Sequence, residues 1–437
     1  MESIWTNTAR LPSFPSLTED TNTDVLVIGG GMAGVLIAHE LKRAGVHCVV
    51  AEADTLAGGI TKNTTAKITS QHGLIYRKLL KRFGPERAKL YYLANQTAVD
   101  DFRDLCQGLD CDFCEQDSFI YSREDPRILE EELSALAAIG CPAQLVTELP
   151  LPFPTVGGIQ FPRQAQFHPL KFLAAIAKDL TIFEHSRVRE IKDGLAATDQ
   201  GSIHAGFIIV ATHFPFLNTH GSYFLKLFQQ RSYALCLENA PPLEGMYLDA
   251  QENGLSLRSY RNQLIVGGGG HRTGKTGGGW EYLEEFVRSH YPDAKITHRW
   301  ATQDCMSLDG IPYIGQYSAR TPGVYVATGF NKWGMTSSMV AARLLTDLIT
   351  GKSSPYATLF SPSRSILHPQ LGINALEAVG NLLRPSVPRC PHMGCALKWN
   401  PRERTWDCPC HGSRFTEKGR LIDNPATGDL KKAPINR

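Results

Sequence analysis

The feature that most constrains the fold is a glycine-rich turn that joins a short apolar run to an amphipathic segment. Residues 24–28 have the pattern of a buried strand and residues 35–44 that of a helix. The turn between them reads Gly29-x-Gly31-x-x-Gly34, with Met32 and Ala33 before the last glycine. The first glycine permits a tight turn, the second lets backbone N–H groups approach a pyrophosphate, and the third lets the helix pack on the strand. A second strand ends at Glu52, where a carboxylate can accept ribose hydroxyls, so this stretch predicts a dinucleotide site in an α/β fold.

Length and composition limit the class of protein. The chain has 437 residues, which predicts two or three domains, and 42% apolar with 20% charged residues is typical of a globular protein. Lys+Arg 45 against Asp+Glu 43 argues against a nucleic-acid partner. The sequence has neither a signal-peptide core nor a run of 18 apolar residues, and its 11 cysteines are odd in number and mostly scattered. We therefore expect a cytoplasmic protein that does not span a membrane.

The loop after Glu52 contains Gly58 and Gly59, followed by several hydroxyl residues. Adjacent glycines at this place suit a loop that folds back over the pyrophosphate. His72, at the end of the same loop, either lies near the ring of the bound cofactor or is an ordinary surface histidine. Farther on, residues 206–212 predict a parallel-type buried strand, and residues 233–267 alternate as in an antiparallel sheet.

Two motifs match well-known patterns only in part. Cys106-x4-Cys111-x2-Cys114, with Cys141 beyond it, copies the opening spacing of a plant-type ferredoxin, but no glycine-rich loop surrounds it. We interpret these cysteines as small buried residues. Residues 269–276 satisfy the P-loop pattern, yet Gly277-Gly-Gly279 delays the next helix to about Trp280, whereas a P-loop helix starts at the Lys-Thr pair. A flexible loop over a substrate cleft is the better interpretation of that segment.

The region from Asp309 to Thr350 repeats the arrangement of strand, glycine turn and helix. It contains the segment Gly310-Ile-Pro-Tyr-Ile-Gly315, a strand at 323–328, and the turn Gly329-Phe-Asn-Lys-Trp-Gly334 before a helix. With the opening fingerprint, these motifs resemble the D-amino-acid oxidase (DAO) superfamily of FAD-dependent oxidoreductases over residues 24–360. The resemblance implies an FAD domain built from about 24–80, 150–215 and 300–367. An antiparallel substrate domain of about 85–149 and 216–299 is inserted through it.

The same resemblance implies FAD as cofactor and oxidation of a C–N or C–O bond by hydride transfer to the flavin. Besides the residues named above, it assigns FAD contacts to Val188, Thr212, Gly310, Gly329, Trp333, Gly334, Met335 and Thr336. On the substrate side the sequence offers four candidates. They are His72, Arg258, His271 and Lys332. Arg258 could clamp a carboxylate or could be a solvated residue of a sheet face.

The C-terminal part carries a second redox motif. After a linker at 368–389, Cys390-x-His392 and Cys408-x2-His411 supply two thiolates and two imidazoles. These boxes resemble the Rieske [2Fe–2S] pattern, in which two cysteines hold one iron and two histidines the other. The resemblance also implies a disulfide between Cys395 and Cys410. The alternative is a structural zinc site, which nothing in the boxes specifically requires. A domain of residues 390–437 is shorter than usual, so metal ligation must supply much of its stability.

Together the two parts resemble bacterial FAD/Rieske fusion proteins, a resemblance that implies no substrate. We expect a small amine or amino acid to reduce FAD, after which electrons leave singly through the cluster to an unknown acceptor protein. Three alternatives stay open. Electrons could flow inward from an external reductant, the protein could be a plain O2-dependent oxidase, or it could be a redox sensor.

Overall fold

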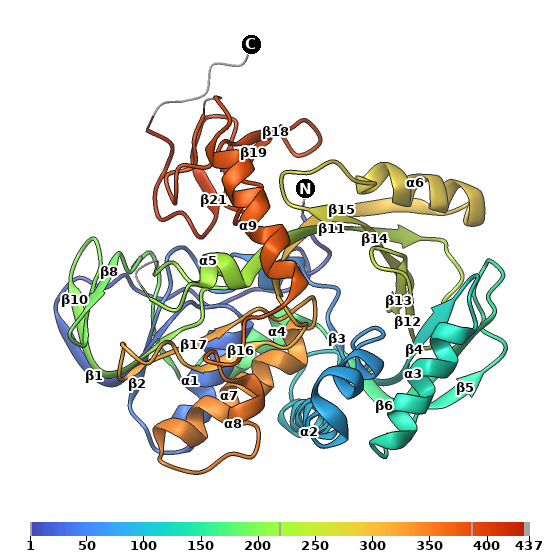
Figure 1. Cartoon of the computed structure of the whole chain (residues 1–437), viewed down its shortest axis with the longest axis horizontal. Coiled ribbons are helices and arrows are strands. Elements are labelled where there is room, and N and C mark those ends of the chain that lie inside the picture. Colours follow the sequence, from blue (N-terminus) through green and yellow to red (C-terminus); the bar gives the residue numbers. More distant parts are fainter. Residues whose placement is uncertain (1, 218–219, 386–387, 432–437) are drawn as a thin grey trace.

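The computed structural model describes residues 2–217, 220–385 and 388–431, and these form three β-sheets with helices packed around them (Figure 1). The last six residues of the expected Rieske domain lie outside the described residues. The mixed α/β architecture with a small all-β C-terminal domain confirms the expected fold class.

The first sheet, which we call the nucleotide-binding sheet after the dinucleotide site predicted at the end of β1, has the strand order β16-β17-β10-β1-β2-β7, with β9 on β10 and β8 on β9. Its central strands β10, β1 and β2 are parallel, and residues 25–28 of β1 are wholly buried because helices or chain cover both faces. The bounds are β1 Thr21–Ile28, β2 Cys48–Ala51, β7 Thr181–Phe183, β8 Glu190–Lys192, β9 Leu195–Ala197, β10 Ser202–Val210, β16 Tyr313–Gln316 and β17 Val324–Thr328.

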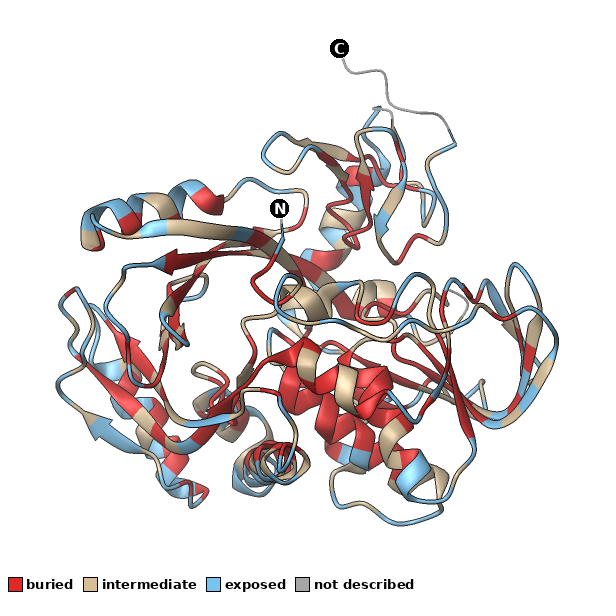
Figure 2. Ribbon diagram, turned by 180° about the vertical axis from the view of Figure 1, so that it is seen from behind, coloured by how far each residue is buried: buried red, intermediate tan, exposed pale blue. Residues whose placement is uncertain are grey.

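The helices that accompany this sheet contain much of the main core. Figure 2 shows how much of their surface is buried. α1 and α7 belong to one hydrophobic cluster that also takes in parts of α2 and α4. The bounds are α1 Met32–Arg43, α4 Pro169–Ile176, α5 Tyr223–Lys226, α7 Gly334–Ile349 and α8 Ala357–Phe360.

The second sheet is larger, with the order β15-β11-β14-β13-β12-β4-β6-β3 and with β5 on β6. Its pairs are antiparallel except β12 with β4. The strands are β3 Lys67–Ile68, β4 Cys114–Ser122, β5 Gln144–Val146, β6 Gly157–Gln166, β11 Leu227–Glu238, β12 Met246–Asp249, β13 Ser256–Tyr260, β14 Gln263–Arg272 and β15 Lys295–Ser307. The accompanying helices are η1 Ile60–Asn63, α2 Tyr76–Leu105, α3 Arg127–Ala138 and α6 Gly279–His290.

The second sheet recruits strands from segments expected in the FAD domain. Strands β3 and β6, and the end of β15, all pair here although they fall within 24–80, 150–215 and 300–367. Helix α2 begins at Tyr76, within the segment 24–80, and is kinked at Gly84, whose φ is 80°. More segments of the chain therefore contribute strands to the second sheet than the sequence pattern indicates.

The two partial motifs have structural explanations. Cys106, Cys111 and Cys141 are buried in the main core and Cys114 is exposed. Among the described residues, these four do not form a cluster whose ligand atoms could share one metal ion. Helix α6 starts at Gly279 and not at Lys275-Thr276, so the P-loop geometry is absent from this loop.

The C-terminal domain is a four-stranded antiparallel meander that follows a helix. Helix α9 spans Pro369–Leu382, and the strands are β18 Lys398–Asn400, β19 Thr405–Asp407, β20 Arg414–Thr416 and β21 Leu421–Asp423. The domain packs on the ends of β11, β14 and β15 (Figure 1). Across the described ranges, no helix combines the length and apolarity needed to cross a membrane.

Candidate functional site

A cavity of about 900 Å³ lies between the nucleotide-binding sheet and the nine-stranded sheet. It begins at the β1–α1 turn, passes Glu52 and the Gly58–Gly59 loop, and reaches the floor formed by β11 and β15. Residues 422–424, 426 and 427 of the C-terminal domain also line it. One continuous space therefore touches all three sheets.

The nucleotide end of the cavity is shaped by close backbone packing. A Cβ on Gly34 would lie 1.8 Å from the carbonyl oxygen of Gly29, and a Cβ on Gly29 would lie 2.7 Å from that of Ala211. Helix α1 starts without a side-chain cap and without an acidic residue in its first turn. An uncapped helix N-terminus that opens into a cavity suits an anionic pyrophosphate. The residues present thus fit a dinucleotide such as FAD.

Glu52 lies at the carboxyl end of β2, as the fingerprint requires. Its two oxygens accept backbone N–H groups, Oε2 from Gly30 at 2.6 Å and Oε1 from Asp54 at 2.8 Å. Burial raises the pKa of this carboxyl above its ordinary value. The two hydrogen bonds fix the orientation of the Glu52 side chain at the wall of the cavity.

Nearly all the residues that the sequence assigned to FAD contact line this cavity. They are Gly29, Gly31, Met32, Ala33, Glu52, Gly58, Gly59, Val188, Thr212, Gly310, Gly329, Trp333, Gly334 and Met335. The two exceptions are Gly34, which packs on Gly29, and Thr336, which lies behind His72.

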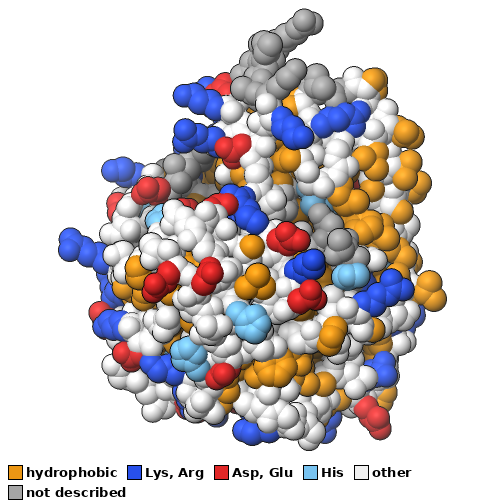
Figure 3. Space-filling model, turned by 90° about the vertical axis from the view of Figure 1, so that its left-hand side faces the viewer, with side chains coloured by type: hydrophobic (Ala, Val, Ile, Leu, Met, Phe, Trp, Pro, Cys, Tyr) orange, Lys and Arg blue, Asp and Glu red, His pale blue; other side chains and the backbone are white. Residues whose placement is uncertain are grey.

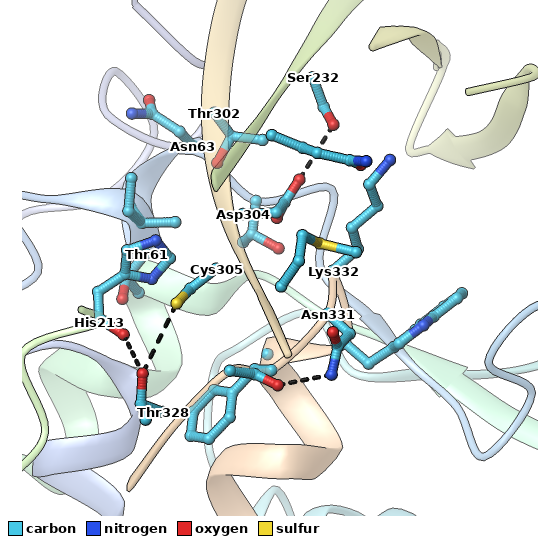
Figure 4. Close-up of a pocket in the computed structure, with 18 of the residues that line it drawn as sticks. Thr61, Asn63, His213, Ser232, Thr302, Asp304, Cys305, Thr328, Asn331 and Lys332 are labelled. Carbon is cyan, nitrogen blue, oxygen red and sulfur yellow. Dashed lines mark hydrogen bonds between the residues drawn. The ribbon is translucent and has the colours of Figure 1, made fainter. Parts of the chain in front are cut away.

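The turn before α7 forms the other end of the cofactor space (Figure 4). Asn331 holds it to β15, donating to the carbonyl oxygen of Gly329 at 2.6 Å and accepting from the Ser307 backbone at 2.8 Å. Asn331 and Lys332 both have positive φ, 52° and 73°. Lys332 points into the cavity and its Nζ lies 3.5 Å from Oδ1 of Asn253. Lys332 and Asn331 thus both line the cavity.

His72 lines the cavity but is engaged on both ring nitrogens. Nδ1 contacts the Tyr91 hydroxyl at 2.7 Å, and Nε2 contacts the Thr69 carbonyl at 2.8 Å. Its ring stacks on Trp333 with centroids 4.6 Å apart. Burial lowers the pKa of His72 to about 3. These contacts favour a neutral histidine that positions Trp333, with no nitrogen left for a substrate.

Arg258 and His271 lie outside the cavity lining. Arg258 is fully buried, donates to Ala66 and Gln166, and faces the rings of Trp5 and Tyr260. His271 is hydrogen-bonded to the Tyr233 hydroxyl at 2.9 Å and stacks on that ring. Because a residue on a strand can face either side of its sheet, the sequence could not decide these positions.

The floor of the cavity carries polar residues that the sequence pattern did not single out. On β11 and β15, Gln230 pairs with Asp304 and Ser232 with Thr302, and all four side chains line the space. Ser232 donates to Asp304 at 3.0 Å (Figure 4), and Gln230 donates to Glu252 at 3.1 Å. Two carboxylates thus face the cavity here, Asp304 from β15 and Glu252 from the loop between β12 and β13.

Lys67 is the other unexpected residue. It lines the cavity from β3 and donates to Oγ of Ser256 and to the carbonyl of Tyr247. Burial lowers the pKa of Lys67 to about 7, and the nearby Arg258 adds to this effect. A lysine in this environment is partly neutral near neutral pH and can accept a proton.

The four expected cluster ligands converge in the C-terminal domain. Nδ1 of His392 lies 3.2 Å from Nδ1 of His411, and the thiols of Cys390 and Cys408 contact each other. Two ligand nitrogens on one metal at about 2.1 Å lie roughly 3.0–3.5 Å apart, so the histidine pair fits a shared iron. The two thiols and two imidazoles thus fit a Rieske cluster.

Cys395 and Cys410, the expected disulfide pair, are both free thiols in the structure. Their Sγ atoms lie within 4.8 Å of each other and of Cys408. The pair is close and buried, and the disulfide stays a prediction.

The ligand loops of this domain face the wall of the cavity. Phe214 packs against the rings of both His392 and His411. Nε2 of Gln229 donates to the carbonyl of His411 at 3.0 Å, while its Oε1 lies 3.2 Å from Nε2 of His213, which lines the cavity. One side chain thus joins a cluster-ligand loop to the cavity wall.

Two further contacts strengthen this docking. Asn424 donates to the carbonyls of Thr212 and Phe214 at 2.5 and 2.7 Å, and Gln303 donates to Gly412 at 2.9 Å. The glycine-rich loop that mimics a P-loop closes over the other side, since a Cβ on Gly274 would lie 2.8 Å from Pro409. Gly274 therefore serves close packing against the Cys408–Cys410 loop, while Gly270 of the same loop lines the cavity.

A buried ion cluster completes the interface. Glu403 pairs with Arg231 of β11, with side chains 8% and 2% exposed, and also with Arg414 at 2.7 Å. Arg414 further pairs with Asp407 and Asp423, each at 3.1 Å. Burial works against the charge of Glu403, but Arg231 and Arg414 hold the pKa of this carboxyl below its usual range. Breaking a pair of this kind by removing one partner typically costs about 3–5 kcal/mol, so the two domains are firmly docked.

Comparison with known proteins agrees with this architecture. The sequence profile of the FAD dependent oxidoreductase (DAO) family matches residues 24–348, and that of the Rieske [2Fe-2S] domain matches residues 380–434. The chain is 35% identical over 500 aligned residues to YhfW of Bacillus subtilis (strain 168), which is described as a Rieske 2Fe-2S iron-sulfur protein. That alignment covers 100% of this chain and 98% of the relative.

Two solved structures share the fold of the first two domains. Glycine oxidase from Geobacillus kaustophilus has a TM-score of 0.63 at 20% identity, and covers 79% of this chain and 100% of its own. L-proline dehydrogenase from P. horikoshii has a TM-score of 0.64 at 19% identity, and covers 79% of this chain and 98% of its own. The chain therefore belongs to the DAO family of FAD-dependent oxidoreductases, and it carries a Rieske [2Fe–2S] domain at its C-terminal end.

Proposed function

We propose that this chain oxidises a small amine or amino acid at FAD and passes the electrons one at a time, through the Rieske cluster, to a separate acceptor protein. When bound, FAD can take up two electrons with a hydride and release them singly, whereas the cluster carries one. The observation that carries the proposal is the bridge made by Gln229 between the His411 loop and the cavity wall at His213.

The chemistry of the cavity floor supports an amine as substrate. Asp304 and Glu252 offer carboxylates to a substrate ammonium, and Ser232 fixes the orientation of Asp304. Glycine oxidase and L-proline dehydrogenase, which share the fold, are named for amino-acid substrates. An amine must lose its ammonium proton before it can give up a hydride, so the site needs a proton acceptor. We assign this part to Lys67.

This assignment predicts a pH dependence. Because the pKa of Lys67 is lowered to about 7, the lysine is protonated and inactive below that pH and neutral above it. The rate of flavin bleaching by an amine, followed by anaerobic stopped flow, should therefore rise through about pH 7. Lys67→Gln should lose this rise and slow bleaching by about 100-fold, within the usual range for a general base. Lys332→Gln, also on the cavity, is the control and should keep the rise; a Lys67→Gln profile like that of the wild type would contradict the assignment.

The route through Gln229 has its own test. Gln229→Leu removes the donor to His411 and Asn424 without touching the FAD contacts. Mixed anaerobically with an amine that bleaches the flavin, this variant should bleach normally but reduce the cluster at least about tenfold more slowly, because the bridge is lost. Gln263→Leu, on β14, is the matched control and should behave as wild type.

The outcomes separate the competing functions. Bleaching of both centres by an amine supports the proposal. Bleaching only by a reduced one-electron carrier would contradict it in favour of inward flow. Stoichiometric peroxide formation that does not depend on the cluster would favour a plain oxidase, and the absence of turnover with any donor would favour a sensor.

A further inference from the structure

Helix α9 buries polar residues and exposes apolar ones, which is the reverse of the usual arrangement in a surface helix. Asn374 and Asn381 are 4% and 5% exposed, whereas Leu376 and Val379 are 76% and 54% exposed. A surface helix normally buries its apolar stripe and turns its polar residues to water. The arrangement is therefore not explained by the packing of α9 within this chain.

The buried and half-buried polar residues of α9 are held by hydrogen bonds and an ion pair. Asn374 donates to the carbonyl of Leu225 at 3.1 Å and accepts from Arg272 at 3.0 Å. The carbonyl oxygen of Asn381 accepts from Ala396 at 3.0 Å, which ties the end of α9 to the cluster-ligand loop. Glu377 pairs with Lys275. These bonds fix the rotation of the helix, so its apolar residues cannot turn inward.

The exposed apolar residues of α9 and of the segments beside it make up the surface that we call the α9 face. It consists of Leu367, Ile373, Leu376, Val379, Leu382, Leu383 and Met393. These make up more than half of the large apolar side chains that are exposed in the described part of the chain. Hydrophobic side chains gather along one edge of the molecule beside the C-terminal domain (Figure 3). A concentration of this kind marks an interaction site.

The α9 face has a basic surround. Residues 367–400 contain one acidic residue, Glu377, which pairs with Lys275, against Arg384, Arg389 and Lys398. Arg389 donates to the carbonyl of Leu382, and Arg82 of α2 donates to that of Leu367. The net charge beside the apolar stripe is thus positive, which is complementary to an anionic surface.

The composition of the α9 face distinguishes between possible occupants. A second copy of the chain would bring its own arginines against these arginines across a two-fold axis, which is unfavourable. Protein interfaces are enriched in Trp, Tyr and Phe, yet residues 367–393 contain none of these three residue types. Aliphatic side chains beside lysines and arginines are instead typical of helices that lie in a lipid interface.

We propose that the α9 face binds the surface of a lipid bilayer that contains anionic headgroups. With 14 residues, α9 is too short to span a bilayer of the usual thickness, for which about 20 are needed, so it lies in the plane of the interface. Its leucines enter the acyl region while Arg384 and Arg389 meet the phosphates. This contact rests on the surface alone and does not depend on which reaction the protein catalyses.

Vesicle flotation of the full holoprotein tests this contact. The protein should float with vesicles of equal parts phosphatidylglycerol and phosphatidylcholine, and much less with phosphatidylcholine alone or at high salt. Leu376→Glu/Leu383→Glu should lower partitioning by at least about tenfold, because two apolar side chains are lost from the acyl region and two like charges are added. Leu145→Glu, at a leucine 48% exposed on β5, is the matched control and should float as wild type.

The basic residues beside the α9 face lead to a separate prediction about lipid preference. Arg384→Gln should reduce the preference for phosphatidylglycerol several-fold while leaving the weak binding to phosphatidylcholine unchanged. The proposal is overturned if the wild type does not float, or if the double leucine variant floats equally well. A dimer in sedimentation that the leucine variant dissociates, without flotation of the wild type, would overturn it in favour of a second copy.

Discussion

Replacement of Cys408 by serine should abolish the iron–sulfur absorption and EPR signals while leaving the flavin spectrum in place. Cys408 is wholly buried, and its thiol contacts those of Cys390, Cys395 and Cys410. A Rieske cluster needs both cysteines on one iron, so the loss of one thiolate leaves that iron without a complete ligand set. We expect the iron content of the purified variant to fall to background.

The loss should also affect the stability of the whole C-terminal domain. Its core consists of Cys390, Cys395, Leu397, Cys408, Cys410, Phe415 and Ala426. With four cysteines in this set, only three other buried apolar side chains and the partly buried Trp406, Leu421 and Leu430 remain to offset the ordering of the domain, and metal ligation must supply the rest. Limited proteolysis should therefore cut the variant within residues 388–431 much faster than the wild type.

Two controls make the result specific. Cys114→Ser changes an exposed cysteine on β4 and should leave iron, spectrum and protease resistance unchanged. Zinc analysis of the wild type decides the alternative metal. A rhombic EPR signal that survives in Cys408→Ser would show that the cluster is held by other residues, and would overturn the ligand assignment.

A comparably large effect is expected from Gly34→Ala. The added Cβ would fall 1.8 Å from the carbonyl oxygen of Gly29, so α1 must move away from β1. Overpacking of this kind costs about 1–3 kcal/mol, and the shift also displaces the helix N-terminus that faces the pyrophosphate. FAD affinity should fall by at least about 100-fold, measured as flavin content after purification and by titration of the apoprotein.

Gly372→Ala is the matched control for this change. Gly372 lies in α9, and a Cβ there would meet nothing within 4 Å. That variant should keep its full flavin content, because alanine is the better helix former. An equally yellow Gly34→Ala protein would mean that the β1–α1 contact is not what holds the dinucleotide site in shape.

Local chemistry let the sequence determine the two cofactor sites. The glycines at 29, 31 and 34 and the acid at 52 are separated by spacings that one strand, one turn and one helix translate directly into positions. Cys390, His392, Cys408 and His411 lie on two short loops of one small domain, where sequence spacing restricts their geometry in the same way.

The positions of the substrate-side residues depend on long-range strand pairing, which only the tertiary structure decided. Asp304 reaches the cavity because β15 pairs with β11, and Lys67 because β3 joins the far edge of the same sheet. Arg258 has a guanidinium that could bind a carboxylate, but it is buried in the sheet, outside the cavity lining. A slip of one residue in any strand would reverse each of these outcomes.

The interface between the domains also depends on contacts that local sequence patterns do not specify. Gln229 and His411 are 182 residues apart, and Arg231 and Glu403 are 172 apart. Nothing in the local pattern of either segment specifies the other, since each contact joins the surfaces of two different domains. The sequence by itself determined which cofactors the chain can hold, and the tertiary structure decided how they are joined, because coupling depends on positions in space and not on spacing along the chain.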